Sequence, residues 1–305
     1  MVTITEGLAV DDTPIVRLDN GVLQVDVAPT VGGKIVNVLH KATGHQFLWH
    51  NARLKLERLS PGSEYDPNFY GGIDELLPND IPEPLNGVAS PDHGELWTLP
   101  LAAAITGHTL VMSGTLPLCG LAYRKALALQ LDAPYIELDY RIENRTAEPR
   151  IFLWKLHAAL DIEPGDRIIC PAATVRVVDP QWCRWKSVQP FPWPVIEGER
   201  ADVIPANDGT MAFLFLYDLQ DGRMTWRSGS RGLEFSYIFD RRVFPYTWYF
   251  ASYGGFAGHY TAILEPCTTM PLSVNAAAGL GQCSRLGPGE TIETRVTVYA
   301  GPVAA

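Results

Sequence analysis

Short segments in which apolar and polar residues alternate are the main feature of the hydrophobic pattern along the chain. The clearest segment is 135–144, where four apolar residues alternate with four charged ones. Segments 291–298 and 23–28 show the same period of two, and 213–217 is a short continuous apolar run. Successive side chains of a β-strand point to opposite faces of its sheet, so these segments predict strands with a buried face.

Helical patterns are weak by comparison. No stretch of about 12 residues keeps apolar side chains at the i, i+3, i+4 and i+7 positions of a helix face. Short helical turns are expected near 72–77 and 273–278. The 27 glycines and 24 prolines are spread through the chain and mark frequent turns. The pattern predicts an all-β protein, a large antiparallel β-sandwich with under about 15% helix, built as a single domain over 1–305.

The overall composition excludes several classes of protein. Hydrophobic residues make up 47% of the chain and charged residues 19%, which suits a buried core and not a disordered acidic chain. The 34 acidic and 24 basic residues give a net charge of −10, without the basic stripe that would neutralise nucleic-acid phosphates. No apolar run approaches the roughly 20 residues that span a bilayer. We therefore expect neither a nucleic-acid partner nor a membrane partner.

The N-terminal sequence and the cysteines favour a cytoplasmic protein. The sequence MVTITEGLAV lacks the basic segment followed by an apolar one that marks a signal peptide. The 5 cysteines are scattered and include no C-x-x-C pair, which argues against a structural zinc site and a disulfide framework. We expect reduced and mostly buried thiols.

A candidate general base lies near the end of the chain. Glu265 follows the apolar run 262–264 and precedes Pro266. A carboxylate at the end of a buried strand is partly desolvated, which raises its pKa and makes it a better proton acceptor. The alternative for Glu265 is a solvated strand-end carboxylate in a surface salt bridge.

A candidate general acid lies on another predicted strand. Lys155 and His157 alternate with Trp154 and Leu156, so the strand has one polar and one apolar face. The polar face is expected to line a cavity, and histidine is the usual proton donor near neutral pH. The alternative is a hydrogen-bonded core histidine.

Polar residues also gather in the long segment 60–100, which is predicted to be a functional loop. Asp74 follows two glycines there, and His93 and Glu95 have H-x-E spacing. Zinc deaminases share that spacing but require a downstream P-C-x-x-C, which is absent. A metal-dependent sugar isomerase with His93, Glu95 and His157 as ligands is one alternative. A hydrogen-bonding role for His93 in the loop is the other.

Tryptophans near these polar segments favour a sugar ligand. The chain has 8, among them Trp97, Trp182 and Trp248. Flat aromatic faces stack on the apolar faces of pyranose rings, while carboxylates and imidazoles bind hydroxyl groups. We therefore expect Trp97 and Trp248 to contact a sugar together with Asp74, Glu95 and Lys155. The alternative is that the tryptophans fill a large β core.

Several short motifs follow one another in a recognisable order. They are Gly32-Gly33-Lys34-Ile35, Gly71-Gly72, His93-Gly94 with Trp97, Asn144-Arg145-Thr146, His157 with Pro164-Gly165-Asp166, Leu264-Glu265-Pro266, and Leu286-Gly287-Pro288-Gly289-Glu290. In this order, over roughly residues 20–299, the chain resembles the galactose mutarotase-like superfamily, which includes the aldose 1-epimerases.

The resemblance implies a fold, an activity and roles for three residues. The family fold is a β-supersandwich with an open groove, and family enzymes interconvert the α and β anomers of free sugars without a cofactor. By resemblance, Glu265 is the general base, His157 the general acid, and His93 the second histidine that holds the ring. The implied partner is a small sugar substrate in carbohydrate metabolism, bound without a metal. A monomer or a homodimer is expected.

Two further functions compete with mutarotation. A non-catalytic carbohydrate-binding or sensor protein would keep the aromatic groove without needing Glu265 or His157 as catalysts. A glycoside hydrolase or polysaccharide lyase would need a second carboxylate about 5–10 Å from Glu265, and Asp74, Glu75 and Glu95 are the candidates. Resemblance in fold does not decide between these functions.

Overall fold

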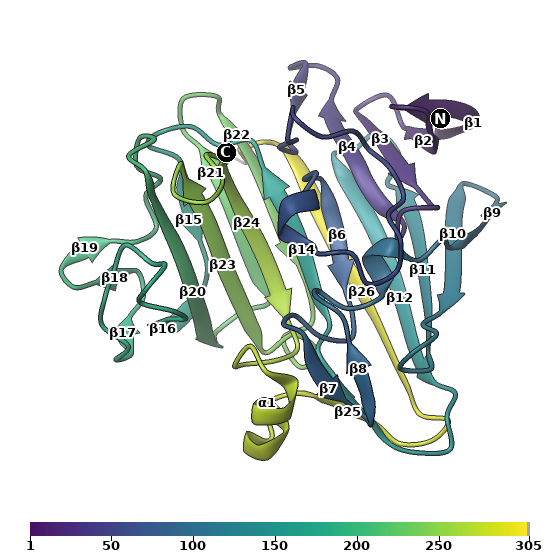
Figure 1. The fold of residues 1–305 in the computed structure, drawn as a ribbon. Helices are drawn as coiled ribbons and strands as arrows, with labels where there is room; N and C mark the ends of the chain where they lie inside the picture. Colours follow the sequence, from purple (N-terminus) through teal and green to yellow (C-terminus); the bar gives the residue numbers. More distant parts are fainter. Residues whose placement is uncertain (304–305) are drawn as a thin grey trace.

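Two large antiparallel sheets make up most of the computed structural model, which describes residues 1–303 (Figure 1). Strands account for 51% of the residues and helices for 4%. The predicted all-β sandwich with little helix is therefore confirmed. Within residues 1–303, no helix has the length and apolar character needed to cross a membrane.

The first sheet has 12 strands and carries the candidate site. Its strands in spatial order are β1 (Thr3–Val10), β2 (Thr13–Asp19), β3 (Leu23–Ala28), β4 (Lys34–His40), β6 (Ile73–Leu76), β14 (Lys155–Leu160), β24 (Tyr260–Cys267), β23 (Tyr246–Tyr253), β20 (Thr210–Leu219), β16 (Ala172–Val177) and β17 (Phe191–Pro192), with β5 (His45–Gln46) paired to β4.

The second sheet has 8 strands and covers the first. Its order is β15 (Arg167–Ile169), β21 (Arg223–Ser228), β22 (Leu233–Ile238), β26 (Thr291–Pro302), β12 (Tyr135–Asn144), β11 (Leu121–Leu129), β10 (Thr109–Thr115) and β9 (Ala102–Thr106). Three two-stranded pairs complete the strands: the hairpins β7 (Glu83–Leu85) with β8 (Val88–Ser90) and β18 (Val195–Ile196) with β19 (Glu199–Arg200), and the long-range pair β13 (Arg150–Phe152) with β25 (Ser284–Leu286).

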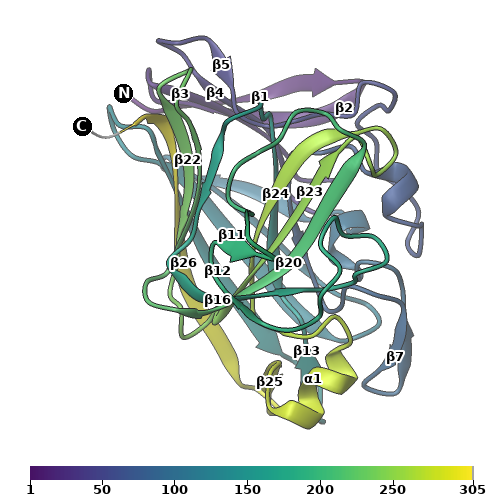
Figure 2. The same ribbon diagram turned by 90° about the vertical axis from the view of Figure 1, so that its left-hand side faces the viewer.

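The hydrophobic core lies between the two sheets, which pack face to face (Figure 2). Val25 and Leu264 of the first sheet belong to the same buried cluster as Leu138 and Val296 of the second. The predicted alternation in β12 is observed, because its apolar residues at 136, 138, 140 and 142 are buried. Stacked sheets about 10 Å apart bury one face of every central strand. Because side chains alternate between the two faces, every second residue of such a strand is apolar.

Helical structure is confined to short segments. The α-helix α1 (Val274–Leu280) begins at Ser273, whose side chain accepts a hydrogen bond from the Ala276 amide, and ends at Gly281 in the left-handed conformation. The 3-10 turn η1 (Asp66–Asn68) lies between β5 and β6, and the 3-10 turn η2 (Leu96–Thr98) lies between β8 and β9. The helical turn expected near 273–278 is therefore confirmed.

The helical turn expected near 72–77 is wrong, because β6 occupies that segment. Gly71 precedes it with φ of +96°, and a Cβ there would lie 2.1 Å from the carbonyl oxygen of Trp49. β6 then pairs with β14, and its neighbouring side chains Asp74 and Glu75 point to opposite faces of the sheet. Each carboxylate meets a different buried lysine, which an exposed helical turn would not provide.

Candidate functional site

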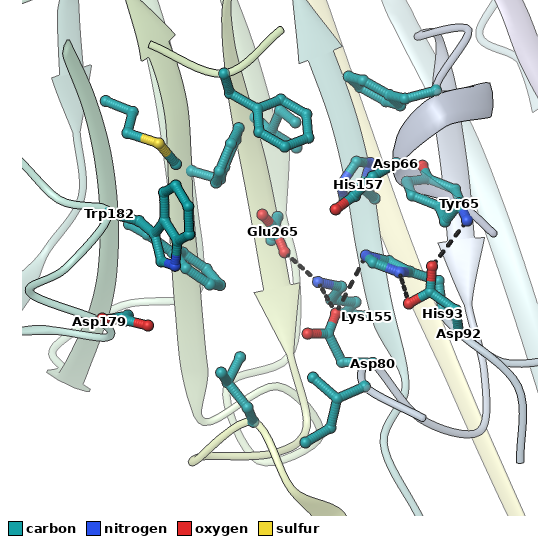
Figure 3. A pocket seen from close by; sticks show the side chains of 18 residues that line it. Tyr65, Asp66, Asp80, Asp92, His93, Lys155, His157, Asp179, Trp182 and Glu265 are labelled. Carbon is teal, nitrogen blue, oxygen red and sulfur yellow. Dashed lines mark hydrogen bonds and ion pairs between the residues drawn. The ribbon is translucent and has the colours of Figure 1, made fainter. Parts of the chain in front are cut away.

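A cavity of about 460 Å³ lies on the face of the first sheet that points away from the core. Lys155 and His157 of β14 and Glu265 of β24 form its polar floor (Figure 3). The two strands are neighbours, with Ala158 paired to Leu264. Leu264 belongs to the core cluster, so the alternate residues His157 and Glu265 face the cavity. The connections between β5 and β6 (Tyr65), between β6 and β7 (Asp80), and between β8 and η2 (Asp92 and His93) supply the polar wall.

Lys155 holds two carboxylates at the centre of the floor. Its Nζ lies 2.7 Å from Oε2 of Glu265 and 2.5 Å from Oδ1 of Asp80. All three side chains are almost fully buried. Burial opposes the charge of Lys155, but the two carboxylates outweigh it and raise the pKa of Lys155. Lys155 is therefore a fixed cation at neutral pH. Its ammonium also lies 4.5 Å from the ring centre of Trp248.

Glu265 combines strong burial with an ion pair to Lys155. Desolvation raises the pKa of Glu265 above its ordinary value, and the nearby Lys155 ammonium limits that rise. A carboxylate whose pKa is raised in this way binds a proton more readily than a solvated one. Glu265 therefore has the environment of a proton acceptor.

His93 is a histidine whose charged form is stabilised. Its Nδ1 lies 2.8 Å from Oδ1 of Asp92, and its Nε2 lies 3.7 Å from Oδ1 of Asp80. The ring stacks on Tyr65, with 4.2 Å between ring centres. Burial alone would lower the pKa of His93, but Asp80 and Asp92 outweigh burial and raise it. The other oxygen of Asp92 accepts a hydrogen bond from the Tyr65 amide, which fixes the carboxylate in place.

His157 is in the opposite electrostatic state. Burial, followed by the positive charges of Lys155, His93 and Lys34, lowers the pKa of His157 well below its ordinary value. The ring is therefore neutral at pH 7. Its Nδ1 lies 3.3 Å from the hydroxyl of Tyr65.

The hydrogen bonds of Tyr65 determine the tautomer of His157. The Tyr65 hydroxyl donates to Oδ2 of Asp74 at 2.8 Å, and the same Oδ2 accepts from Nζ of Lys34 at 2.6 Å. A phenol has one proton to donate, so Nδ1 of His157 must donate to the Tyr65 oxygen. The Nε2 atom of His157 then keeps its lone pair and is a hydrogen-bond acceptor.

The structure brings four of the predicted site residues together: Glu265, His157, His93 and Lys155 all line the cavity. Asp74 lies behind Tyr65, outside the lining, in its ion pair with Lys34.

The other three predicted substrate contacts also lie outside the lining. Glu95 is buried, and its carboxylate accepts from the amides of Leu118 at 2.6 Å and Cys119 at 2.9 Å. Trp97 packs edge-on against Tyr65. Trp248 is fully buried beneath Lys155 and donates from Nε1 to the carbonyl of Thr269. These residues support the site from behind because their polar atoms are bonded away from the cavity.

The geometry removes the metal alternative that rested on Glu95. Its carboxylate is bonded to two backbone amides, so it does not join His93 and His157 as a third ligand. Among residues 1–303, no group of three His, Cys, Asp or Glu side chains has the arrangement of a metal site. A hydrolase would need Asp74, Glu75 or Glu95 beside Glu265. Glu75 points into the core, and Asp74 and Glu95 lie outside the cavity lining. The carboxylate next to Glu265 is Asp80, and Lys155 is bonded to both.

Sequence reasoning missed Tyr65, Asp80 and Asp92. All three lie in the loop that was expected to be functional, but the loop has no period from which side-chain directions follow. Asp92 had a usable signal, because it directly precedes His93. The Tyr65 and Asp80 contacts arise from long-range folding of the loop onto β14.

Comparison with known structures shows the fold. The Slr1438 protein of Synechocystis sp. PCC 6803 has 16% sequence identity over 97% of this chain and 98% of its own, with a TM-score of 0.73. A galactose mutarotase-like protein from Clostridium acetobutylicum has 15% identity over 99% of both chains, with a TM-score of 0.71. A galactose mutarotase related enzyme from Lactobacillus acidophilus has 12% identity over 94% of this chain and 97% of its own, with a TM-score of 0.68.

A family model described as a domain of unknown function, DUF5107, matches residues 9–79. This match covers the first strands and the beginning of the long loop. Together with the fold, the structural neighbours show that the chain has the galactose mutarotase-like fold over nearly its whole length.

Proposed function

We propose that the protein interconverts the α and β anomers of a reducing sugar, as an aldose 1-epimerase does. One observation carries this proposal: a single cavity contains a buried carboxylate with a raised pKa, Glu265, and an imidazole with a raised pKa, His93. Mutarotation needs a base for the anomeric hydroxyl and an acid for the ring oxygen. The two raised pKa values suit these two tasks near neutral pH.

Glu265 takes the proton of the anomeric hydroxyl in this mechanism. Protonation of the ring oxygen by the His93 imidazolium breaks the bond between that oxygen and C1, which leaves an open-chain aldehyde. Rotation about the C1–C2 bond presents the other face of the aldehyde, and the reverse proton transfers close the ring. The protons balance, because Glu265 and His93 recover their initial states when the ring closes.

The electrostatics favour a different assignment of the two histidines from the one expected by resemblance. His157 was expected to be the acid, but its pKa is lowered well below the ordinary value, so it is unprotonated at neutral pH. Its Nε2 is suited to accept a hydrogen bond from a sugar hydroxyl and orient the ring. His93 is the better donor because Asp80 and Asp92 stabilise its protonated form.

Lys155 keeps Glu265 in its basic form and so belongs to the same mechanism. Without its charge, burial would favour the protonated carboxyl, which cannot accept a proton. Lys155 is already bonded to Asp80 and Glu265, and its raised pKa makes it a poor proton donor. We therefore assign it an electrostatic role.

Exchange spectroscopy by NMR tests the function directly. Exchange between the anomers of hexoses, pentoses, uronic acids and sugar phosphates is measured with the wild type and with Glu265→Gln. We expect catalysed exchange of at least one sugar and a loss of at least about 10²-fold in Glu265→Gln.

Glu95→Gln is the matched control, because Glu95 is also a buried glutamate but is bonded to backbone amides outside the cavity lining. We expect its exchange rate to stay near that of the wild type. A wild type that binds sugars and catalyses no exchange would instead support the non-catalytic carbohydrate-binding alternative.

A further inference from the structure

The cavity has two chemically different ends. The titratable residues Lys155, His93 and His157 gather at one end, and Trp182 lies at the other with Glu265 between them (Figure 3). Met211 and other apolar side chains line the wall around Trp182. Proton transfer at an anomeric centre uses the polar end and leaves the aromatic end without a role.

Trp182 is exposed to an unusual degree for such a large apolar side chain. It has 61% of its surface accessible although it lines a cavity. The segment that carries it is anchored, since Cys183 and Trp185 are buried. The amide of Arg184 donates to the carbonyl of Met211 at 2.8 Å, which ties the segment after Trp182 to β20.

The turn before Trp182 is anchored as well. The amide of Val178 donates to the carbonyl of Phe213 at 2.9 Å, and the amide of Cys183 donates to the carbonyl of Asp179 at 3.1 Å. The Asp179 side chain accepts from the amide of Gln181 through Oδ1 and also lines the cavity. An anchored segment therefore presents an aromatic side chain and a carboxylate at this end of the cavity.

We propose that Trp182 and Asp179 form a subsite for a second sugar ring, so that the ligand is an uncharged reducing disaccharide or a longer reducing saccharide. This proposal rests on the proposed function, which requires a free anomeric carbon at the polar end. The Trp182 ring offers a stacking face for a pyranose, and Asp179 offers an acceptor for its hydroxyls.

The size of the cavity agrees with two rings. Its volume of about 460 Å³ falls in the range of roughly 300–1,000 Å³ that holds drug-sized ligands. A disaccharide has that size, whereas a monosaccharide has about half as many non-hydrogen atoms. A single ring seated at Glu265 would leave the aromatic end filled with water.

The charge of the lining excludes acidic sugars from this class. Five carboxylates line the cavity, and Lys155 and His93 are the lining side chains whose positive charge is stabilised, whereas His157 is neutral. Lys155 is already bonded to Glu265 and Asp80, and no arginine is among the described lining residues. A phosphate or carboxylate on the sugar would meet repulsion without a cation to receive it.

The test compares lactose, cellobiose and maltose with glucose, which is the reducing ring of all three. Saturation-transfer difference NMR on the whole protein shows which ring of each ligand contacts the protein. Exchange spectroscopy gives KM for each sugar. We expect saturation of both rings and a KM for at least one disaccharide at least about fivefold below that for glucose, as aromatic stacking would give.

Trp182→Ala should remove the saturation of the second ring and bring the ratio of disaccharide KM to glucose KM close to one. Trp182→Phe keeps an aromatic face and should retain most of the preference. Leu131→Ala is the matched control, because Leu131 is also 61% exposed and does not line the cavity. Its ratio should equal that of the wild type.

Saturation confined to the reducing ring, failure of all three disaccharides to bind, or a KM ratio unaffected by Trp182→Ala would overturn the subsite. The NMR contact experiment does not depend on turnover. If no sugar is exchanged but the second ring still contacts Trp182, the proposed function fails and the subsite stands. If exchange is catalysed and Trp182→Ala has no effect on either measurement, the subsite fails and the function stands.

Discussion

The Tyr65 hydroxyl lies 3.3 Å from Nδ1 of His157 and links that imidazole to a buried ion pair behind the cavity. The ion pair joins Lys34 and Asp74 with 2.6 Å between Nζ and Oδ2, and Tyr65 donates to the same carboxylate. This chain of hydrogen bonds fixes the neutral tautomer of His157 that carries its proton on Nδ1. The site thus depends on residues that never contact the cavity.

Tyr65→Phe removes the acceptor for Nδ1–H of His157. Because one hydrogen bond is worth roughly 1 kcal/mol, we expect kcat/KM to fall about fivefold. We also expect the ¹⁵N resonances of His157 to move toward a mixture of tautomers. Tyr70→Phe is the control, since Tyr70 packs on His50 away from the cavity. Unchanged ¹⁵N resonances and kinetics in Tyr65→Phe would contradict the assigned relay.

The roles of the two cavity histidines are separable by kinetics. His93→Asn removes the proposed proton donor and should lower kcat by about 10²-fold or more. His157→Asn removes the proposed acceptor for a sugar hydroxyl and should raise KM more than it lowers kcat. Both variants are compared by NMR exchange on one sugar. The opposite pattern, with kcat lost only in His157→Asn, would restore His157 as the acid.

The pH profile tests the charge state of His93. The proposed reaction needs Glu265 ionised and His93 protonated, so kcat/KM should rise above the ordinary carboxyl pKa and fall as His93 loses its proton. Asp80 and Asp92 raise the pKa of His93, which places the falling limb above the ordinary histidine value of 6.5.

Asp92→Asn removes one of these negative charges. The pKa of His93 should then decrease, and the falling limb should move to lower pH while the rising limb stays in place. Asp179→Asn, at the other end of the cavity, should leave the position of the falling limb unchanged. A falling limb that does not move in Asp92→Asn would show that His93 is not the group that titrates there.

The fold was predictable because burial of one sheet face makes apolar and polar residues alternate along each strand. Segment 135–144 became β12 with its even-numbered apolar side chains in the core. The same logic placed Lys155 and His157 on one face of a strand, where they meet Glu265 from the neighbouring strand. Strand periodicity therefore identified the floor of the site.

The polar wall and the charge states were not predictable in the same way. The loop with Asp80 and Asp92 has no repeating pattern, so its contacts depend on tertiary folding. Glu95 and Asp74 have the residue types of a sugar site, but each is bonded to a partner outside the cavity. The depressed pKa of His157 comes from burial and three cations, of which only Lys155 is close to it in sequence.

Glu75 and Lys125 form a buried ion pair that contributes to the stability of the fold. Both side chains have no exposed surface, and Lys125 Nζ lies 2.6 Å from Oε1 of Glu75 between the two sheets. The Tyr140 hydroxyl donates to the same oxygen at 2.6 Å. Removing one partner leaves the other charge buried and uncompensated, which costs about 3–5 kcal/mol.

Lys125→Met should therefore lower the free energy of unfolding by about that amount in urea titrations, with little change in the m value. The matched control is Arg295→Met, which breaks the exposed pair with Asp139, where the two groups are 2.7 Å apart. Exposed pairs contribute under about 1 kcal/mol because water and salt screen them.

The double variant Lys125→Met/Glu75→Gln removes both charges and should be more stable than Lys125→Met alone. Equal losses for Lys125→Met and Arg295→Met would show that the buried pair is not paired in solution as it is in the structure.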